Sequence, residues 1–398
     1  MKIEATRKLK EMISLYFMEA KNARHNDRKV AWVTSGGPVE VLYAMDVIPV
    51  YPENHGAMIG AQKMGGELCE VAEGRGYSPD LCSYFRTDIG QALTGKSPIM
   101  GLPEPDMLLC CNNICGIVTK WYEIQARYYN VPNFMVDTPF LYGDLDEITI
   151  TYVAEQLKEL AEDVEKVTGR PLDEEKLRET GVLADEAVRL WAECLDFCAH
   201  VPSPMSAFDT FIHMVPIVSM RGDKRAVEYY RILRDELADH VAKGHSAVEN
   251  ERYRLLWDNI PIWFKLRDLS KKLASLDACL VCATYTDSWA SVPISLADGD
   301  PWRAMAVAYL SPYINCGLER RAEVMIGLME KFKVHGFVLH SNRGCKAYSL
   351  GQYDLRRIVA ERTGLPGVSI EADMTDERQH SDQQLNTRIE AFIESLEG

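Results

Sequence analysis

Residues 108–123, LLCCNNICGIVTKWYE, decide the expected fold of this chain. The apolar run Met107–Cys111 predicts a buried strand, and the two asparagines that follow it end that strand. After a tight loop that contains Cys115, a helical spacing of apolar side chains begins at Val118. In open α/β sheets, ligands bind in the loops at the carboxyl ends of the strands. The position of Cys115 therefore favours a chemical role for its thiol over a packing role.

A second segment near the other end of the chain repeats this pattern. Residues 334–340 predict a strand, the loop SNRGC that follows ends in Cys345, and residues 349–362 predict a helix. In both cases a short strand follows the helix after a Val-Pro or Leu-Pro step, at residues 131–137 and 365–371. We therefore expect an α/β fold with two doubly wound parallel-sheet domains of the Rossmann or flavodoxin type, with their cysteine loops facing each other.

The length of 398 residues exceeds the usual size of a single core, so two domains are expected. We place an N-terminal α/β domain at residues 1–145, a helical connecting segment at residues 146–204 and a C-terminal α/β domain at residues 205–398. The sequence Pro202-Ser203-Pro204 marks the second boundary. Helices are also expected over residues 5–23, 60–74, 147–201, 225–242 and 247–258.

Charge and hydropathy limit the classes of function. The net charge of −15 argues against nucleic-acid binding as the main task. No apolar stretch is long enough to span a bilayer, and the N-terminal residues lack the uninterrupted apolar core of a secretory signal. We therefore expect a cytoplasmic protein that binds neither nucleic acid nor membrane.

Two more loops are expected at the same edge of the N-terminal sheet. Residues 30–33 and 47–51 predict strands, with a helix opened by Pro38 between them. The turn after the first strand offers the hydroxyl of Ser35, and a loop after the second offers the carboxylate of Glu53. Parallel strands place Ser35, Glu53 and Cys115 on one rim, although a Ser-Gly-Gly turn and an exposed glutamate are also ordinary surface features.

Eleven cysteines are many for a protein of a reducing compartment, so metal or redox use must be considered. Cys82 is expected in the first turn of a helix capped by Ser78, where unpaired N–H groups and the helix dipole stabilise a thiolate, and Arg86 follows on the same face. Cys194 and Cys198, at helical spacing, are expected to be packing residues. The sequence neither assigns nor excludes a metal role for Cys69, Cys110, Cys111, Cys279, Cys282 and Cys316, although the spacing of Cys279 and Cys282 within one strand favours a structural role.

Cys82, Cys115 and Cys345 are candidates for one metal centre between the two domains. Their spacing is unlike that of zinc ribbons, whose ligands come in close pairs. Iron–sulfur clusters normally take four thiolates, so a 4Fe–4S cluster held by three would leave one iron open to substrate. Two tryptophans, Trp257 and Trp263, could line an apolar pocket or pack in the core, and the histidines at 335 and 340 are expected to be structural.

Several stretches resemble one known family. They are ELCE at 67–70, YSPDLCSY at 77–84, PDMLLCCNNICGIVTKWY at 105–122, YRLLWDNIPIW at 253–263 and SNRGCKAYSLGQ at 341–352. Over nearly its whole length the chain is similar to cluster-bearing subunits of the 2-hydroxyacyl-CoA dehydratase and benzoyl-CoA reductase family, and most similar to the dehydratase subunit that carries the active site. The resemblance implies that Cys82, Cys115 and Cys345 hold a 4Fe–4S cluster, with Ser35 and Glu53 in the pocket.

The resemblance also implies a reaction and partners. We expect a subunit of an oxygen-sensitive hydro-lyase that eliminates water from an (R)-2-hydroxyacyl-CoA to give the 2-enoyl-CoA through a ketyl radical. A homologous second subunit would complete a heterodimer, and an ATP-dependent iron–sulfur activator would supply the electron. The alternatives are a benzoyl-CoA reductase-like or double-cubane-cluster reductase, a non-catalytic electron-relay subunit, and a zinc-binding or cofactor-free scaffold. The sequence does not indicate which acyl group is the substrate.

Overall fold

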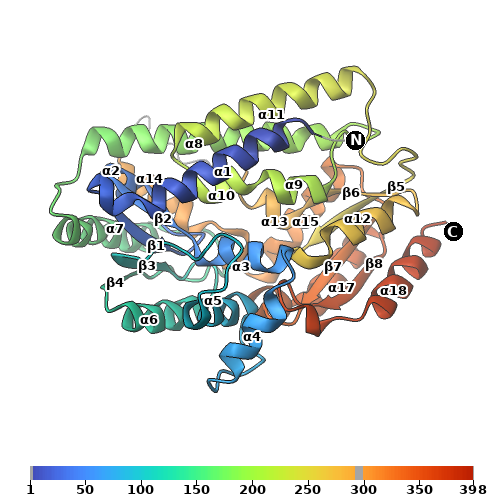
Figure 1. Ribbon diagram of the computed structural model, residues 1–398. Helices are drawn as coiled ribbons and strands as arrows, with labels where there is room; N and C mark the ends of the chain where they lie inside the picture. Colours follow the sequence, from blue (N-terminus) through green and yellow to red (C-terminus); the bar gives the residue numbers. More distant parts are fainter. Residues whose placement is uncertain (1–2, 292–298, 398) are drawn as a thin grey trace.

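The computed structural model describes residues 3–291 and 299–397, and these residues form two four-stranded parallel sheets (Figure 1). The N-terminal sheet has the order β2-β1-β3-β4 and the C-terminal sheet the order β6-β5-β7-β8. The strands are β1 (Lys29–Val33), β2 (Val47–Val50), β3 (Met107–Cys111), β4 (Asn133–Val136), β5 (Tyr253–Asp258), β6 (Ala278–Ala283), β7 (Gly336–Asn342) and β8 (Gly367–Ala372). Both halves therefore repeat one topology, as the two cysteine-loop units predicted.

The central strands of the N-terminal sheet, β1 and β3, are almost continuous apolar runs because helices cover both faces of the sheet. Every residue of β1 from Val30 onward and every residue of β3 is buried. In each sheet the strand order reverses between two neighbours, β1 and β3 in the first and β5 and β7 in the second. A crevice opens at such a reversal, at the carboxyl ends of the strands. Ser35 follows β1, Cys115 follows β3 and Cys345 follows β7, so all three lie at these crevices.

Helices connect the strands. The first half contains α1 (Ala5–Lys21), α2 (Glu40–Ala44), α3 (Pro52–Ala61), α4 (Gly65–Glu73), α5 (Ser83–Thr94), α6 (Ile117–Tyr129), α7 (Glu147–Thr168) and α8 (Glu174–Asp196). The second half contains α9 (Ala207–His213), α10 (Val215–Ser219), α11 (Lys224–Ala242), α12 (Leu266–Ala274), α13 (Thr284–Asp287), α14 (Pro301–Leu310), α15 (Leu318–Lys331), α16 (Lys346–Ser349), α17 (Gln352–Thr363) and α18 (Asp382–Ser395). Among the described helices, none has an apolar stretch long enough to cross a membrane.

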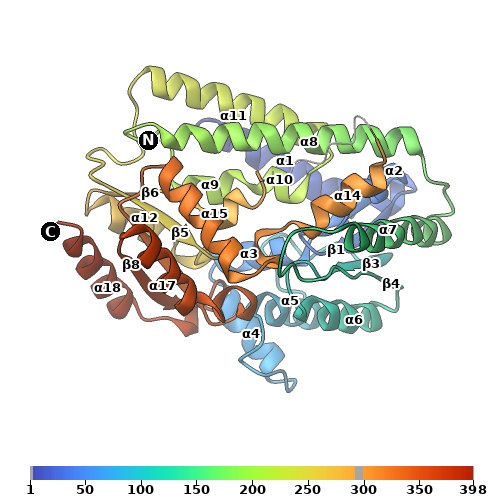
Figure 2. The ribbon, with the colours of Figure 1, turned by 180° about the vertical axis from the view of Figure 1, so that it is seen from behind.

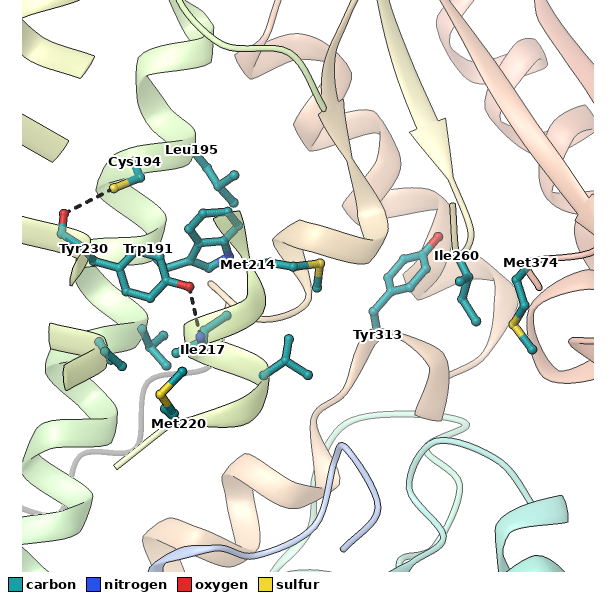
Figure 3. Packing of buried hydrophobic residues seen from close by; sticks show 14 of the residues in the cluster. Trp191, Cys194, Leu195, Met214, Ile217, Met220, Tyr230, Ile260, Tyr313 and Met374 are labelled. Atoms are coloured by element: carbon teal, nitrogen blue, oxygen red, sulfur yellow. Dashed lines mark hydrogen bonds between the residues drawn. The ribbon is translucent and has the colours of Figure 1, made fainter. Parts of the chain in front are cut away.

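The two sheets lie side by side beneath a shared layer of helices. Figures 1 and 2 show α1, α8 and α11 in this layer. Trp191 and Cys194 of α8 pack there against Tyr230 of α11, and the methionines 214 and 220 beside α10 belong to the same cluster (Figure 3). Helix α14 comes from the second half but packs on α7 and on the N-terminal sheet. The division of the chain at residues 145 and 204 stays a prediction.

Several predicted element boundaries are wrong. The segment after β2 is no loop: it forms α3, with Pro52 as the first helical residue, a position that proline favours. Helix α5 begins at Ser83, so Cys82 is its N-cap and the predicted N-cap Ser78 lies outside it. The helix after β1 begins at Glu40 and not at Pro38.

The largest error concerns residues 247–258, where a helix was predicted. Residues 253–258 form β5, the strand that pairs with both β6 and β7. All six of its residues are buried, so its sequence carries no alternation that would distinguish a strand from a buried helix. The helix predicted over residues 60–74 is likewise broken before α4. Gly65 packs there against the backbone of Thr375, and a Cβ at residue 65 would lie 2.0 Å from its carbonyl oxygen.

Candidate functional site

A cavity lies where the carboxyl ends of the two sheets face each other. Residues that follow β1, β2, β3, β5, β6, β7 and β8 all line it. Its lining includes every site residue that the sequence predicted: Ser35, Glu53, Cys82, Cys115 and Cys345. The fold therefore gathers, around one space, side chains that are up to about 300 positions apart in the sequence.

Each of the three cysteines precedes the first turn of a helix. Cys82 is the N-cap of α5, Cys345 is the N-cap of α16, and Cys115 lies two residues before α6. The three side chains are half-buried, and each sulfur faces backbone N–H groups of its own helix. These N–H groups belong to Phe85, Val118 and Tyr348, and they lower the pKa of the three thiols.

Burial nevertheless dominates the pKa of these thiols. It raises the pKa of Cys115 to about 11 and of Cys345 to about 12, and it raises that of Cys82 as well. The pKa of Cys82 is raised further by the negative charge that Cys345 would carry as a thiolate. The pKa of Cys345 is raised further, in the same way, by the charge of a Cys115 thiolate. The three sulfurs are therefore close enough to repel one another as thiolates. A cationic centre between them would remove that repulsion and stabilise the ionised form.

The donor set fits a cluster better than a single ion. Among the described residues, no three His, Cys, Asp or Glu side chains are close enough together to hold one metal ion. A four-iron cluster is several ångströms across and reaches thiolates that are further apart. Arg86, which follows Cys82 on the same face in the sequence, donates to Asp376 at 2.9 Å and to Glu73 at 2.6 Å, so its guanidinium is engaged in a buried ion pair.

A close backbone approach brings two of the cysteine loops together. Gly344 precedes Cys345, and Ser83 follows Cys82. A Cβ on residue 344 would lie 2.4 Å from Oδ2 of Asp373 and 3.2 Å from the backbone nitrogen of Ser83. Only a glycine fits this contact, so the absence of a side chain at residue 344 allows the two loops to meet.

Glu53 is buried at the start of α3, with 7% of its surface exposed. Its Oε1 accepts a hydrogen bond from the backbone N–H of Ser35 at 3.1 Å, and its Oε2 accepts one from the hydroxyl of Tyr122 at 3.3 Å. Burial raises the pKa of Glu53 to about 7, against the lowering effect of these donors. A carboxyl group with this pKa can give or take a proton near neutral pH.

Ser35 presents its hydroxyl beside this carboxyl group. The hydroxyl donates to Oδ1 of Asn54 at 3.4 Å, and the Asn54 amide donates to Oγ of Ser219 at 3.1 Å. Asn113, after β3, donates to the carbonyl oxygens of Gly36 and Tyr309 at 2.9 Å each. These bonds fix the turn after β1 against the loop after β3, across the point where the strand order reverses.

Much of the lining was not predicted. Arg221 reaches the cavity from the turn after α10, donates to the hydroxyl of Tyr309 at 2.9 Å and lies 3.9 Å from Glu40. The other aromatic members are Tyr84, Trp121, Tyr285, Trp289, Tyr313 and Tyr348. Tyr84, Trp121 and Tyr348 lie within six residues of the three cysteines, whereas Tyr285, Trp289 and Tyr313 reach the cavity through long-range packing and carry no local sequence signal.

The remaining cysteines lie outside the lining of this cavity. Cys194 and Cys198 are fully buried. The thiol of Cys194 approaches the carbonyl oxygen of Tyr230 at 3.6 Å (Figure 3), and that of Cys198 approaches the carbonyl oxygen of Met205 at 3.3 Å. Their predicted packing role is confirmed. Cys279 and Cys282 are buried within β6, which supports the structural interpretation.

The fold and the cavity define an α/β protein with two similar halves and a thiol-lined site between them. The family described as 2-hydroxyglutaryl-CoA dehydratase, D-component, matches residues 34–396, and the chain belongs to this family. The predicted family membership is confirmed, and with it the expectation of an enzyme of this family.

Named relatives match over nearly the full length. The (R)-2-hydroxyisocaproyl-CoA dehydratase alpha subunit of Clostridioides difficile is 36% identical over all of this chain and 97% of that protein. The lactoyl-CoA dehydratase subunit alpha of Anaerotignum propionicum is 33% identical over 95% of this chain and 93% of that protein. A benzoyl-CoA reductase subunit of Thauera aromatica is 28% identical over 98% of this chain and 94% of that protein.

Proposed function

We propose that this chain is the site-bearing subunit of a 2-hydroxyacyl-CoA dehydratase, which eliminates water from an (R)-2-hydroxyacyl-CoA to give the 2-enoyl-CoA. The observation that carries the proposal is the cavity where Cys82, Cys115 and Cys345 meet Glu53 and Ser35. Relatives that are 36% and 33% identical over nearly the whole chain are named as alpha subunits of such dehydratases, which gives this function precedence over that of a reductase.

The three cysteines would hold a 4Fe–4S cluster with one iron free of protein ligands. Such a cluster would supply a Lewis-acidic iron for the thioester oxygen and a single electron that promotes loss of the neighbouring hydroxide; the substrate would return this electron once the β-proton is lost, so the elimination is redox-neutral overall. The N–H groups at the starts of α5, α6 and α16 would stabilise the thiolate ligands. A double-cubane cluster needs more cysteine ligands, and three cysteines line the described part of this cavity, which favours a single cluster.

Glu53 and Ser35 would handle the proton of the leaving water. A buried carboxyl group with a pKa of about 7 is largely protonated at slightly acidic pH and can donate to a departing hydroxide. Ser35 lies beside it: its backbone N–H donates to the Glu53 carboxylate, and its hydroxyl donates to Asn54. The serine hydroxyl would orient the α-hydroxyl of the substrate toward the acid.

The proposed function requires other components. The word alpha in the names of the relatives implies a second subunit in those enzymes. For this chain we propose a homologous partner in a heterodimer and a separate ATP-dependent iron–sulfur activator as electron donor. We also propose that the protein is oxygen-sensitive and works in the cytoplasm of an anaerobe that ferments amino acids.

The test is the iron content of single cysteine variants purified without oxygen. Cys82→Ala, Cys115→Ala and Cys345→Ala should each lower the iron content and abolish dehydration. The matched controls Cys194→Ala and Cys198→Ala remove buried thiols outside the cavity and should retain the iron. Full iron retention and activity in Cys345→Ala would refute the ligand set. Dehydration by the purified single chain, given only activator, ATP and reductant, would refute the need for a partner subunit.

A further inference from the structure

A second cavity lies next to the proposed reaction site. It is formed by α1, α3, α9, α10 and the segments after β5 and β6. Most of its lining is aliphatic, aromatic or methionine side chains, among them Ala57, Met58, Val215, Trp263 and Tyr285. Ala61 and Ile212 also line it and are exposed, so this end of the cavity lies near the protein surface.

Its inner end adjoins the site that holds Glu53 and Ser35. Tyr285 lines both cavities. Asn54, which lines the second cavity, follows Glu53 in α3 and accepts the hydrogen bond of the Ser35 hydroxyl at 3.4 Å. The indole N–H of Trp263 donates to the hydroxyl of Tyr84, a residue of the first cavity. The two cavities are therefore adjacent, with Tyr285 as a wall that they share.

The chemistry of the lining selects the occupant. Among the described residues that line the second cavity, none carries a charge. The Asn54 amide is engaged with Ser219 and the Trp263 indole with Tyr84, so few donors remain for a ligand. A pantetheine arm has two amides that would lose their hydrogen bonds in such surroundings. A hydrocarbon chain loses none, and flexible methionines such as Met58 adapt to its shape.

A carboxylate at the end of an acyl chain would also find no partner there. One buried cation near this boundary is Arg221, and it lines the first cavity. Its guanidinium donates to the carbonyl of Gly37 at 3.1 Å and to Tyr309, and it lies 3.9 Å from the carboxylate of Glu40. These contacts commit its charge to the protein.

We infer that the second cavity holds the hydrocarbon side chain of the 2-hydroxyacyl group, and that the substrate is a branched aliphatic or aromatic 2-hydroxyacyl-CoA. This inference rests on the proposed function and adds the substrate class to it. With the α-hydroxyl at Glu53 and Ser35, the side chain on the same carbon would extend toward Asn54 and Tyr285 and enter the apolar space once these two side chains move apart.

Filling the cavity tests the inference in the assembled, cluster-bearing enzyme. Ala57→Leu, and as a second variant Val215→Phe, should lower kcat/KM for 2-hydroxy-4-methylpentanoyl-CoA and for 3-phenyl-2-hydroxypropanoyl-CoA by about tenfold or more. The short substrate 2-hydroxypropanoyl-CoA should stay within about twofold of its wild-type kcat/KM. Met58→Ala enlarges the space and should shift the preference toward the phenyl substrate. Ala360→Leu, at a half-buried position of α17, is the matched control. It should leave the ratios of kcat/KM between the bulky and the short substrates unchanged.

Binding of 4-methylpentanoyl-CoA separates this inference from the proposed function. This ester lacks the 2-hydroxyl group, so its affinity is measurable by titration calorimetry without turnover. If Ala57→Leu binds 4-methylpentanoyl-CoA more weakly but propanoyl-CoA as wild type does, the second cavity binds the acyl side chain. This conclusion holds even if no 2-hydroxyacyl-CoA is dehydrated. Equal losses of affinity for 4-methylpentanoyl-CoA and propanoyl-CoA would assign the cavity to the pantetheine arm and overturn the inference. Unchanged binding and kcat/KM of the bulky esters in both filling variants would also overturn it.

Discussion

The backbone N–H of Ser35 donates a 3.1 Å hydrogen bond to Oε1 of Glu53, which joins the turn after β1 to the first turn of α3 after β2. The other oxygen of Glu53 accepts from Tyr122 on α6. The carboxyl group is thus held at two points by elements that follow β1 and β3, while its own helix follows β2. It faces the cavity in a fixed orientation and does not need to be ordered by substrate.

Glu53→Gln should leave the iron content unchanged and substrate affinity within a few-fold, and should lower turnover by roughly 10²–10⁴. Glutamine keeps the shape and the acceptor for the Ser35 N–H, but it cannot deliver a proton. The measurement is kcat with the reconstituted activator and partner, alongside iron content. Near-normal turnover with unchanged iron would mean that Glu53 only organises the start of α3.

Asp88 supplies a matched control for the loss of any buried carboxyl group. It is fully buried, it accepts from Trp121 at 2.6 Å and from Gln125, and burial raises its pKa to about 6. It is not among the residues that line the cavity. Asp88→Asn should therefore keep kcat within a few-fold of wild type, and a loss as large as that of Glu53→Gln would remove the case for a specific acid.

The pKa of Glu53 also predicts a pH-dependent stability. Its folded value of about 7 lies above the ordinary value of 4.5, so the folded state holds the proton more tightly than the unfolded chain. The stability that Glu53 contributes is full below about pH 4.5 and is lost as the pH rises through about 7. Glu53→Gln has no such ionisation. The free energy of unfolding of Glu53→Gln, measured relative to that of wild type, should therefore rise between pH 5 and pH 8 by at most about 3 kcal/mol. Urea unfolding of both proteins at the two pH values measures it, and a constant difference would contradict the buried, perturbed carboxyl.

The features that the sequence predicts well are local. A run such as MLLCC, then asparagines, then a cysteine before a helical spacing is contained within a few residues, and the structure has β3, the loop of Cys115 and α6 at those positions. The duplicated unit around Cys345 follows the same logic. Local chemistry also identified Ser35 and Glu53, although the predicted loop around Glu53 is the start of a helix.

The features that the sequence misses depend on tertiary packing. Residues 253–258 form a strand because β6 and β7 flank them, and a strand buried on both faces carries no alternation of polar and apolar residues. Arg221 and Tyr309 reach the cavity from segments 88 positions apart, which meet through a hydrogen bond. The fit of Gly344 against Ser83 is equally invisible, because a glycine in a polar loop is commonplace.

Arg221 and Glu40 form a further testable pair. Both are buried, their closest charged atoms are 3.9 Å apart, and Tyr309 donates to Glu40 while it accepts from Arg221. Arg221→Met should destabilise the fold by about 3–5 kcal/mol, because it leaves the Glu40 carboxylate buried without its cation. Chemical denaturation measures the effect.

The double variant Arg221→Met with Glu40→Gln separates the charge from the packing. It removes both charges and keeps an acceptor for Tyr309, so it should recover most of the lost stability. If the double variant is as unstable as Arg221→Met alone, then the loss comes from the packing of the guanidinium against Trp289 and Tyr309, over whose rings it lies at 5.8 and 5.5 Å.

Gly344 and Gly116 give opposite predictions, although each is next to a proposed cluster ligand. A Cβ at residue 344 would lie 2.4 Å from the Asp373 carboxylate and 3.2 Å from the backbone nitrogen of Ser83, so Gly344→Ala should displace that carboxylate and loosen the contact between the Cys345 loop and the start of α5. A Cβ at residue 116 meets nothing within 4 Å, and the φ of Gly116 is −72°, which alanine adopts freely.

Gly344→Ala should therefore lower the iron content and the thermal midpoint together, whereas Gly116→Ala should leave both near wild type. The expected loss of stability at residue 344 is about 1–3 kcal/mol, the usual cost of forcing an atom into a well-packed contact. Both variants keep every cysteine, so a change in iron content reports the spacing of Cys82 and Cys345 and not the loss of a ligand. If Gly344→Ala binds iron as wild type does while its thermal midpoint falls, the close approach stabilises the fold without setting the geometry of the proposed cluster site.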